Sequence, residues 1–284
     1  MPQQRIGRVQ WGDLEFGPGS QIAVTAIEGL DDLPDIRAED MPRPGQHGDY
    51  TGADYTTART VQMKLGLRGQ SPDDLRALSL ALIAATQPQE EPASLQFLDW
   101  DRMVWAKVRK RSVPYDAEFL WSIGDAALEF YCADPYLYGL TEKTASTAAY
   151  SPSSGRTYPL VHPRTYGSAG TTGRITAVNA GASAAYPVLR IDGPVATPAI
   201  EQVTTGGVLT LDATLQPGEY VLIDTRNRGV LFMGSSPRRT WVRAGSVWPQ
   251  LQPGANEIAY RGSALAGAPG QSSLLTVTWR DTSL

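Results

Sequence analysis

The stretch 126–139, AALEFYCADPYLYG, decides how this chain is organised, because a strand pattern and a strand-ending residue stand next to each other there. Leu128, Phe130 and Cys132 alternate with less apolar residues, which is the period-two pattern of a half-buried β-strand. Pro135 cannot donate a hydrogen bond to a sheet and biases the preceding residue toward extended geometry. We therefore expect a strand that ends just before Pro135 and completes a compact domain.

The length of 284 residues is typical of two domains, each large enough to bury its own core. Directly after this strand the chain becomes rich in Ser, Thr, Ala and Gly, as in a linker. The sequence predicts an N-terminal domain at 1–139, a connector at 140–174 and a C-terminal domain at 175–284. We expect one strand inside the connector, near 158–161.

The composition excludes several classes of protein. Charged residues make up 19% and hydrophobic residues 42%, which is the balance of a globular protein. The net charge of -4 argues against a dedicated nucleic-acid binder, and the single Cys132 allows neither an internal disulfide nor a thiolate zinc cluster. No leader pattern and no run near the ~20 apolar residues of a membrane helix is found, so we expect no membrane association.

The N-terminal domain should be mainly β with one α-helix. The clearest strand is 59–67, where apolar and polar residues alternate strictly. A helix should follow, with Ser71 as N-cap, Pro72 at its first position and an end before Pro88. Its apolar face should cover the sheet. The other expected elements are a hairpin over 6–16, a strand at 22–27, a hairpin of 95–97 and 104–108, and strands at 118–121 and 126–132.

The segment 30–55 holds many Asp, Pro and Gly residues and shows no periodicity. A loop of this length is uncommon inside a compact domain and is usually functional or disordered. We interpret it as an interaction arm, with a mobile surface loop as the alternative. A long arm or an exposed strand edge can pair with another chain and so build a cyclic assembly. The candidate interface residues in this part of the chain are Asp31, Asp32, Asp35, Arg43 and His47.

A second candidate interface lies on the strand expected after the 95–97 hairpin. Lys107, Arg109 and Arg111 should share one face, alternating with apolar Val108. The sharper interpretation is a charged contact with the acidic residues of a neighbour's arm, and the simpler one is a solvated strand face. Nucleic-acid binding ranks third, because the chain is acidic and the run lacks interleaved aromatic residues.

The C-terminal domain shows strands and turns without a helical stripe. Short apolar runs are separated by Gly and Pro turns at the spacing expected of a two-sheet β-sandwich or jelly roll. The expected strands are 175–179, 188–191, 199–203, 208–211, 219–224, 229–232, 256–260 and 274–279.

The order of these motifs resembles a known family. The first half contains WGDLEFG, EGLDDLP, RPGQHGDYTGAD, RTVQMKLGLRG, LQFLDWDRMVWAKVRKR and ALEFYCADPYLYG. It looks like the N-terminal belt domain of siphophage distal tail proteins. The second half, with NAGASAAYPVLRIDGP, LQPGEYVLIDTRNRGV, LQPGANEIAYRG and LLTVTWRD, resembles the galectin-like C-terminal β-sandwich of the same family.

This resemblance implies a structural virion protein. Members of the family form a homo-hexameric ring at the distal end of a long non-contractile tail. The ring joins the tail tube protein to the tail-tip hub protein and offers a platform for receptor-binding proteins, with the tape measure protein as a further partner. The resemblance places the chain at the tail tip, where DNA can pass through the ring without specific binding.

Catalysis has little support in the sequence. His47 and His162 are far apart, and no nucleophile-elbow pattern accompanies either. Adjacent carboxylate pairs such as Asp73-Asp74 are explained by helix capping and solvated charge. The glycine-rich segment 167–173 precedes a strand and lacks the Lys-Ser/Thr pair of a phosphate loop. We expect no catalytic residues, no cofactor and no metal.

Carbohydrate binding is the alternative function. β-Sandwiches can hold sugars on one sheet, where aromatic side chains stack on the apolar faces of the sugar rings. Trp279 alternates with apolar neighbours and should lie in the core. Trp241 and Trp248 lie in a loop-like stretch and are the candidate sugar-stacking residues.

Overall fold

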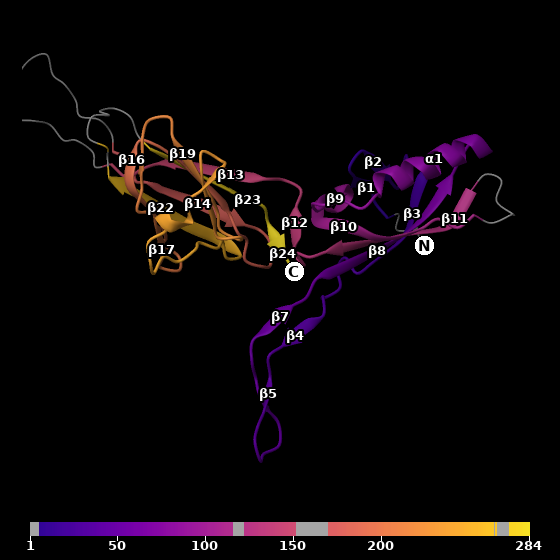
Figure 1. Cartoon of the computed structure of the whole chain (residues 1–284), viewed down its shortest axis with the longest axis horizontal. Coiled ribbons are helices and arrows are strands. Elements are labelled where there is room, and N and C mark those ends of the chain that lie inside the picture. The colour runs from indigo at the N-terminus through magenta and orange to yellow at the C-terminus, as the bar shows by residue number, and fades with distance from the viewer. Residues whose placement is uncertain (1–5, 116–121, 152–169, 264, 266–272) are drawn as a thin grey trace, which may run out of the picture. The chain divides into compact units, whose positions relative to one another are not determined.

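The computed structural model describes residues 6–115, 122–151, 170–263, 265 and 273–284. The chain divides into two compact units, Met1–Leu140 (unit 1) and Thr141–Ser283 (unit 2). The described residues are mainly β-strand, with α1 as their one α-helix, which confirms the predicted fold class (Figure 1). The strands expected at 118–121 and 158–161 lie outside the described residues.

Unit 1 is built on an antiparallel sheet in the order β2-β1-β9-β10-β11-β8-β3, with β12 also paired to β10. The strands are β1 (Val9–Trp11), β2 (Leu14–Phe16), β3 (Ile22–Glu28), β8 (Arg59–Arg68), β9 (Ala93–Phe97), β10 (Arg102–Ser112), β11 (Ser122–Cys132) and β12 (Leu137–Gly139). The first and last strands of this order, β2 and β3, are consecutive in the chain, and the Gly17 amide donates to the Ile22 carbonyl at 2.7 Å. The sheet therefore curls until its two edges meet.

The core of unit 1 follows from strict alternation along its strands. In β8, every second residue from position 61 to position 67 is apolar and at most 1% exposed. The residues between them lie on the outer face of the sheet. The buried set in β8 is Val61, Met63, Leu65 and Leu67. The Trp11 and Phe130 rings meet edge to face, with centroids 5.0 Å apart. The predicted alternation of the strand 59–67, with one apolar face, is confirmed.

The helix α1 (Pro72–Ala85) covers this core, as its sequence predicted. The Ser71 hydroxyl accepts a hydrogen bond from the Asp74 amide at 3.1 Å and so caps the first turn. Leu75 and Leu82, on one face of the helix, are buried against the sheet.

The end of α1 is completed from other elements, because its last turn holds no basic residue. Arg111, from β10, donates to the Ile83 carbonyl at 3.0 Å and to the Thr86 carbonyl at 3.1 Å. The indole of Trp11 donates to the Ala85 carbonyl at 3.0 Å. Carbonyls at a helix end have no partner within the helix, so these two side chains satisfy them and fix α1 on the sheet.

The segment 30–55 is a β-hairpin rather than an irregular loop, and Figure 1 shows it extending from the start of β8. Its ladder has two parts, β4 with β7 and β5 with β6. We call residues 35–57 the arm. Its strands are β4 (Ile36–Ala38), β5 (Met41–Pro42), β6 (Asp49–Tyr50) and β7 (Asp54–Thr56).

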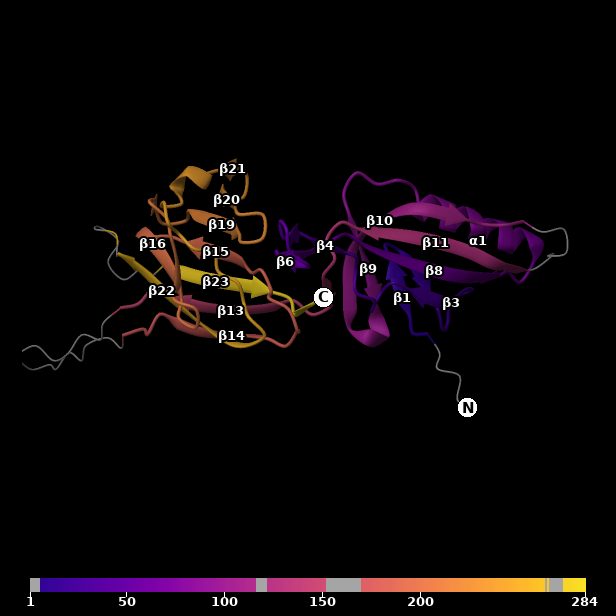
Figure 2. The same ribbon diagram turned by 90° about the horizontal axis from the view of Figure 1, so that it is seen from below.

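Unit 2 consists of two antiparallel sheets. One has the order β13-β23-β15-β19-β20-β21, which can be followed in Figure 2, and the other has the order β14-β22-β16-β17, with β18 beside β16. The strands of these sheets are β13 (Lys143–Ala148), β14 (Arg174–Asn179), β15 (Val188–Asp192), β16 (Val195–Gln202), β17 (Gly207–Thr210), β18 (Thr214–Leu215), β19 (Tyr220–Asp224), β20 (Gly229–Phe232), β21 (Ser236–Pro237), β22 (Gly254–Ser263) and β23 (Leu274–Trp279). The short strand β24 (Thr282–Ser283) follows β23 in the chain and belongs to neither sheet. Residues 143–148, placed in the connector from the sequence, form β13 along β23.

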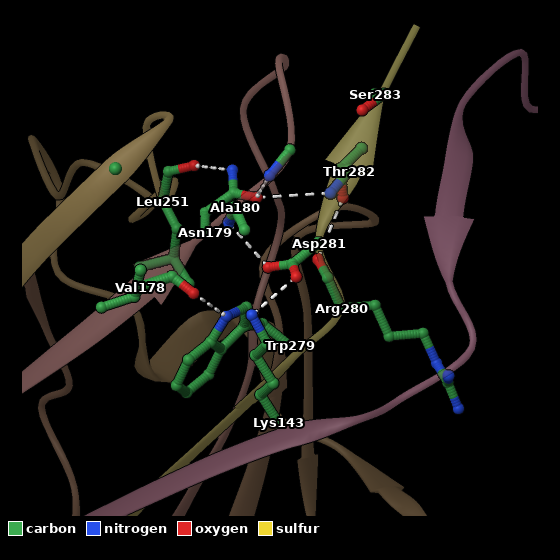
Figure 3. A network of polar contacts seen from close by, with 12 residues as sticks. Lys143, Val178, Asn179, Ala180, Leu251, Trp279, Arg280, Asp281, Thr282 and Ser283 are labelled. Carbon is green, nitrogen blue, oxygen red and sulfur yellow. Dashed lines mark hydrogen bonds and ion pairs between the residues drawn. The ribbon is translucent and has the colours of Figure 1, made fainter. Parts of the chain in front are cut away.

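A buried polar network closes one end of unit 2 (Figure 3). The Asn179 side chain is fully buried and donates to the Ser183 and Leu251 carbonyls at 2.8 and 3.0 Å. The indole of Trp279 donates to the Val178 carbonyl at 3.0 Å, and the residue is 6% exposed. Trp279 is therefore a core residue, as its alternation predicted.

Candidate interaction surfaces

The root of the arm is anchored by Arg59, the first residue of β8, which is 2% exposed. Its guanidinium donates to the backbone carbonyls of Gly29, Leu30 and Asp32 at 3.1, 2.6 and 2.6 Å, and to the Pro135 carbonyl at 2.9 Å. One side chain therefore joins the segment that enters the arm, the strand that leaves it and the end of β11.

The surroundings of Arg59 are poor in solvent. Burial lowers the pKa of Arg59, and burial raises the pKa of the Cys132 thiol, its cross-strand neighbour, to about 12. The acceptors of the Arg59 hydrogen bonds are four backbone carbonyl oxygens, which are fixed dipoles, and not a charged carboxylate. Each contact needs the backbone to follow one path, so Arg59 fixes the direction in which the chain leaves the domain.

The arm itself is exposed along its whole length. Every residue from 35 to 55 is exposed, including large apolar side chains that a folded domain normally covers. Ile36 and Tyr55 are 50% exposed, Tyr50 is 59% exposed and Met41 is 67% exposed. An exposed two-stranded hairpin with this much apolar surface is a candidate surface for another protein.

Arginine and tyrosine side chains stack across the two strands of the hairpin. Arg37 lies over the ring of Tyr55, its direct partner in the ladder, at 5.5 Å, and Arg43 lies over the ring of Tyr50 at 5.0 Å. At Gly52 a Cβ atom would meet the carbonyl oxygen of Glu39 at 2.0 Å, so only glycine allows the strands to approach there.

The acidic candidates from the sequence have different roles in the structure. Asp31 forms an ion pair with Arg102 of the same chain. Asp32 and Asp35 contribute backbone carbonyls at the arm root, which accept from Arg59 and from the Thr57 amide. Their side chains are exposed. His47 and Arg43 lie at the arm tip, also exposed.

The basic candidates of β10 do not share one face. A β-bulge at Arg109 shifts the register, because one extra residue moves the following side chains to the opposite side. Arg109 lies over the Tyr131 ring at 4.8 Å, whereas Arg111 turns toward the end of α1. Lys107 donates to the Glu90 carbonyl. The predicted common face is therefore wrong, and Arg111 has a role inside unit 1.

The two candidate sugar-stacking residues are partly buried and already carry cations. Trp241 ends the short helix η2 (Arg239–Trp241) and meets the Phe232 ring edge to face, with centroids 5.4 Å apart. The guanidinium of Arg238 lies over Trp241, and that of Arg239 lies over Trp248. Sugar stacking by these two residues stays a prediction. The sequence analysis did not identify the arginines that lie over these rings, although the stretch PRRTWVR at 237–243 contains both of them.

No group of three or more His, Cys, Asp or Glu side chains that could hold a metal ion is found in the part of the chain that the structure describes. Within the same residues, no helix is long and apolar enough to cross a membrane.

Comparison with known proteins gives two family matches, one in each unit. Residues 21–132 match the phage tail protein RIFT-related domain, and residues 180–281 match the C-terminal domain of the siphovirus-type tail component. The two matches and the two β units that carry them define a phage tail protein. The chain belongs to the siphophage distal tail protein family.

Solved structures show the same fold. The crystal structure of the SPP1 Dit (gp 19.1) protein aligns with a TM-score of 0.61 at 17% identity, over 90% of this chain and 92% of that chain. A chain of the phage P2 baseplate in its activated conformation with Ca aligns with a TM-score of 0.50 at 10% identity, over 95% of this chain and 96% of that chain. None of the curated proteins matches this sequence. The protein is thus a structural component of a phage tail.

Proposed function

We propose that this protein forms a homo-hexameric ring at the distal end of a long non-contractile tail, where it joins the tail tube to the tail-tip hub. In this proposal unit 1 is the ring-forming belt domain and unit 2 is a galectin-like domain that offers a platform for receptor-binding proteins. The role is structural and not enzymatic. The tape measure protein is a further proposed partner, and DNA passes through the ring.

The observation that carries the ring is the exposed arm. A cyclic assembly needs a head-to-tail contact in which one surface of a subunit meets a different surface of the next. The arm provides such a surface, because its apolar side chains are uncovered while its root is fixed by Arg59. A contact that is already ordered before assembly loses less conformational entropy on binding.

The test is to shorten the arm without disturbing its root. Ile36 and Thr56 are direct partners in an antiparallel pair, so residues 37–55 can be replaced by Asn-Gly, which suits a two-residue hairpin turn. We expect the shortened protein to fold and to remain a monomer by light scattering, while the native chain gives a six-fold ring in negative-stain images. A second test variant is Met41→Ser with Tyr50→Ser, which keeps the hairpin length and removes two cross-strand apolar side chains. It should weaken the ring without abolishing the fold.

Rings of normal size from the shortened protein would refute the role of the arm. If the native chain is a monomer alone, the same two proteins are mixed with purified tail tubes. Capping of the tubes by the native chain and by the shortened chain to the same extent would also refute it.

A further inference from the structure

The root of the arm holds a hollow of about 250 Å³, which we call the root pocket. It is lined by the end of β3, by the segment that follows and by the short helix η1 (Leu98–Trp100). The lining side chains are Ile27, Glu28, Leu30, Asp31, Asp32 and Trp100. Trp100 stacks on Phe97, with ring centroids 5.8 Å apart, and is still 42% exposed. The pocket therefore offers an aromatic surface that the chain itself leaves open.

The root pocket is acidic, and one of its carboxylates has no close cation. Residues 27–35, IEGLDDLPD, hold four carboxylates and no Lys or Arg. Two of these carboxylates are paired within the chain, Glu28 with Lys64 and Asp31 with Arg102. Asp32 is exposed, and in the described part of the chain no Lys or Arg lies within ion-pair distance of its carboxylate; the buried Arg59 acts on it only from farther away. The Asp32 carboxylate is therefore open to a cation from outside the chain.

The tip of the arm carries the opposite charge. Residues 41–48, MPRPGQHG, hold Arg43 as their one Lys or Arg and contain no carboxylate. Arg43 is exposed, and its guanidinium lies over the Tyr50 ring at 5.0 Å. Among the described residues, the Arg43 side chain has no carboxylate within ion-pair distance and no hydrogen-bond acceptor. Its N–H edge is therefore available, because the tyrosine contacts only the face of the guanidinium.

Arg43 cannot reach the root pocket of its own chain. Ile36 pairs with Thr56 near the root, and Met41 pairs with Tyr50 toward the tip, so the two strands run outward together (Figure 1). Position 43 lies seven residues beyond position 36, which is roughly 23 Å along an extended strand. That distance exceeds the length of an arginine side chain. The two opposite charges can therefore meet only between two copies of the chain.

We propose that Arg43 of one subunit occupies the root pocket of the next, between the Asp32 carboxylate and the Trp100 ring. This contact rests on the proposed function, because it names the surface that receives the arm in the ring. A guanidinium suits both groups: its edge donates two hydrogen bonds to a carboxylate, and its face stacks on an indole. The contact joins two different surfaces of the subunit, so it repeats from copy to copy around a ring.

Exposed apolar side chains stand beside both halves of this contact. At the tip, Met41 is 67% exposed and Tyr50 is 59% exposed. At the root, Leu33 follows Asp32 directly and is 64% exposed. Burial of these side chains around the ion pair would exclude water from it, which strengthens the attraction between the charges.

Other occupants fit the root pocket less well. The basic residues of β10 that the sequence suggested for this acidic region are already engaged, since Lys107 and Arg111 donate to carbonyls of their own unit. A basic segment of another tail protein is the remaining alternative. An exchange of charges within this chain separates the two cases, because it restores a contact between copies but not a contact with a different protein.

The experiment exchanges the two charges in the full chain. Arg43→Asp and Asp32→Arg should each raise the concentration needed for ring assembly by about tenfold or more, and the double variant should return to within about threefold of the native chain. The matched control combines Arg43→Asp with Glu91→Arg, which has the same net charge and alters an exposed residue between α1 and β9. It should not restore assembly. The readout is light scattering over a range of concentrations, or capping of purified tail tubes if the native chain alone is a monomer.

The outcomes distinguish this contact from the general role of the arm. A charge-exchange double variant that assembles no better than Arg43→Asp, while the shortened arm abolishes the ring, would overturn the contact and leave the role of the arm standing. Rings of normal size from the shortened chain would overturn both. Equal rescue by Glu91→Arg would mean that only total charge matters and would overturn the contact as well.

A neutral double-mutant cycle keeps the test decisive if the charge reversal at Asp32 disturbs the arm root, which urea unfolding of that variant reports. Asp32→Asn and Arg43→Gln should each weaken assembly severalfold. Both changes together should weaken it little further than one, because either change breaks the same ion pair. Additive losses in this cycle would overturn the proposal.

Discussion

Replacing Arg59 by methionine should destabilise unit 1 and should leave unit 2 unchanged. Methionine fills a similar volume but donates no hydrogen bond, so four carbonyl oxygens lose their partner. Two of these contacts, to the Pro135 and Leu30 carbonyls, are fully buried, and water can reach the other two.

The size of the effect follows from these two buried acceptors. Each carbonyl left unpaired in the interior costs about 1–3 kcal/mol, and water replaces the lost bonds at the other two. The variant also avoids the cost of burying a guanidinium, which offsets part of the loss. We expect a net decrease of about 2–4 kcal/mol in the free energy of unfolding of unit 1.

The measurement is urea unfolding of the full chain, followed for each unit by hydrogen exchange of its strands. Unit 2 serves as an internal reference, because Arg59 lies in unit 1 and its four hydrogen-bond partners are all there. The matched control is Arg102→Met, at the same arm root. Its ion pair with Asp31 is exposed, with the two side chains 46% and 67% accessible, so the change should cost less than about 1 kcal/mol. Equal losses for Arg59→Met and Arg102→Met would refute the reasoning from burial.

Three further predictions concern unit 1. Arg111→Gln should lower its stability by about 1–2 kcal/mol and speed hydrogen exchange in the last turn of α1, because the Ile83 and Thr86 carbonyls lose a charged donor; unchanged exchange there would count against the capping role. Cys132 should resist alkylation in the native chain, since burial raises the pKa of its thiol to about 12, and react only on unfolding. Because the pKa of the thiol is higher in the folded chain than its unfolded value near 9, the stability that Cys132 contributes is complete below pH 9 and is lost as the pH rises toward 12. Urea unfolding of Cys132→Ala should lack this part of the pH dependence. The same pH dependence in the alanine variant and the native chain would contradict this prediction.

The sequence predicted those parts of the fold that show both a periodic pattern of buried residues and a local signal for where the element begins or ends. Strand 59–67 and the helix after Ser71 carry period-two and cap signals that depend on neighbours in the chain, and both formed as expected. The arm gave no such signal, because apolar alternation reports burial and every residue from 35 to 55 is exposed. Its ladder is held by backbone bonds and by arginine–tyrosine pairs such as Arg37 with Tyr55, which no periodicity reveals.

The candidate sites were predicted less well than the fold, for a related reason. The bulge at Arg109 inserts one residue into β10, and nothing in the run KVRKRS distinguishes a regular strand from a bulged one. The role of Arg59 depends on carbonyls from three separate segments, so it becomes visible only once these segments meet in space. The alternation of the strand puts Arg59 in phase with Val61 and Met63, on the inner face, but it does not show which groups pair with a buried guanidinium.

The position of Arg59 connects the stability of unit 1 with the proposed assembly. The arm has no core of its own, since its residues from 35 to 55 are all exposed, so its direction must be set where it leaves the domain. There the guanidinium holds the entering segment at Leu30 and Asp32, while its own backbone begins β8. A ring requires each subunit to reach the next at the same angle, because small angular errors prevent closure. The buried charge costs free energy that an apolar residue would not, and its four directed bonds supply the fixed geometry that a closed ring needs.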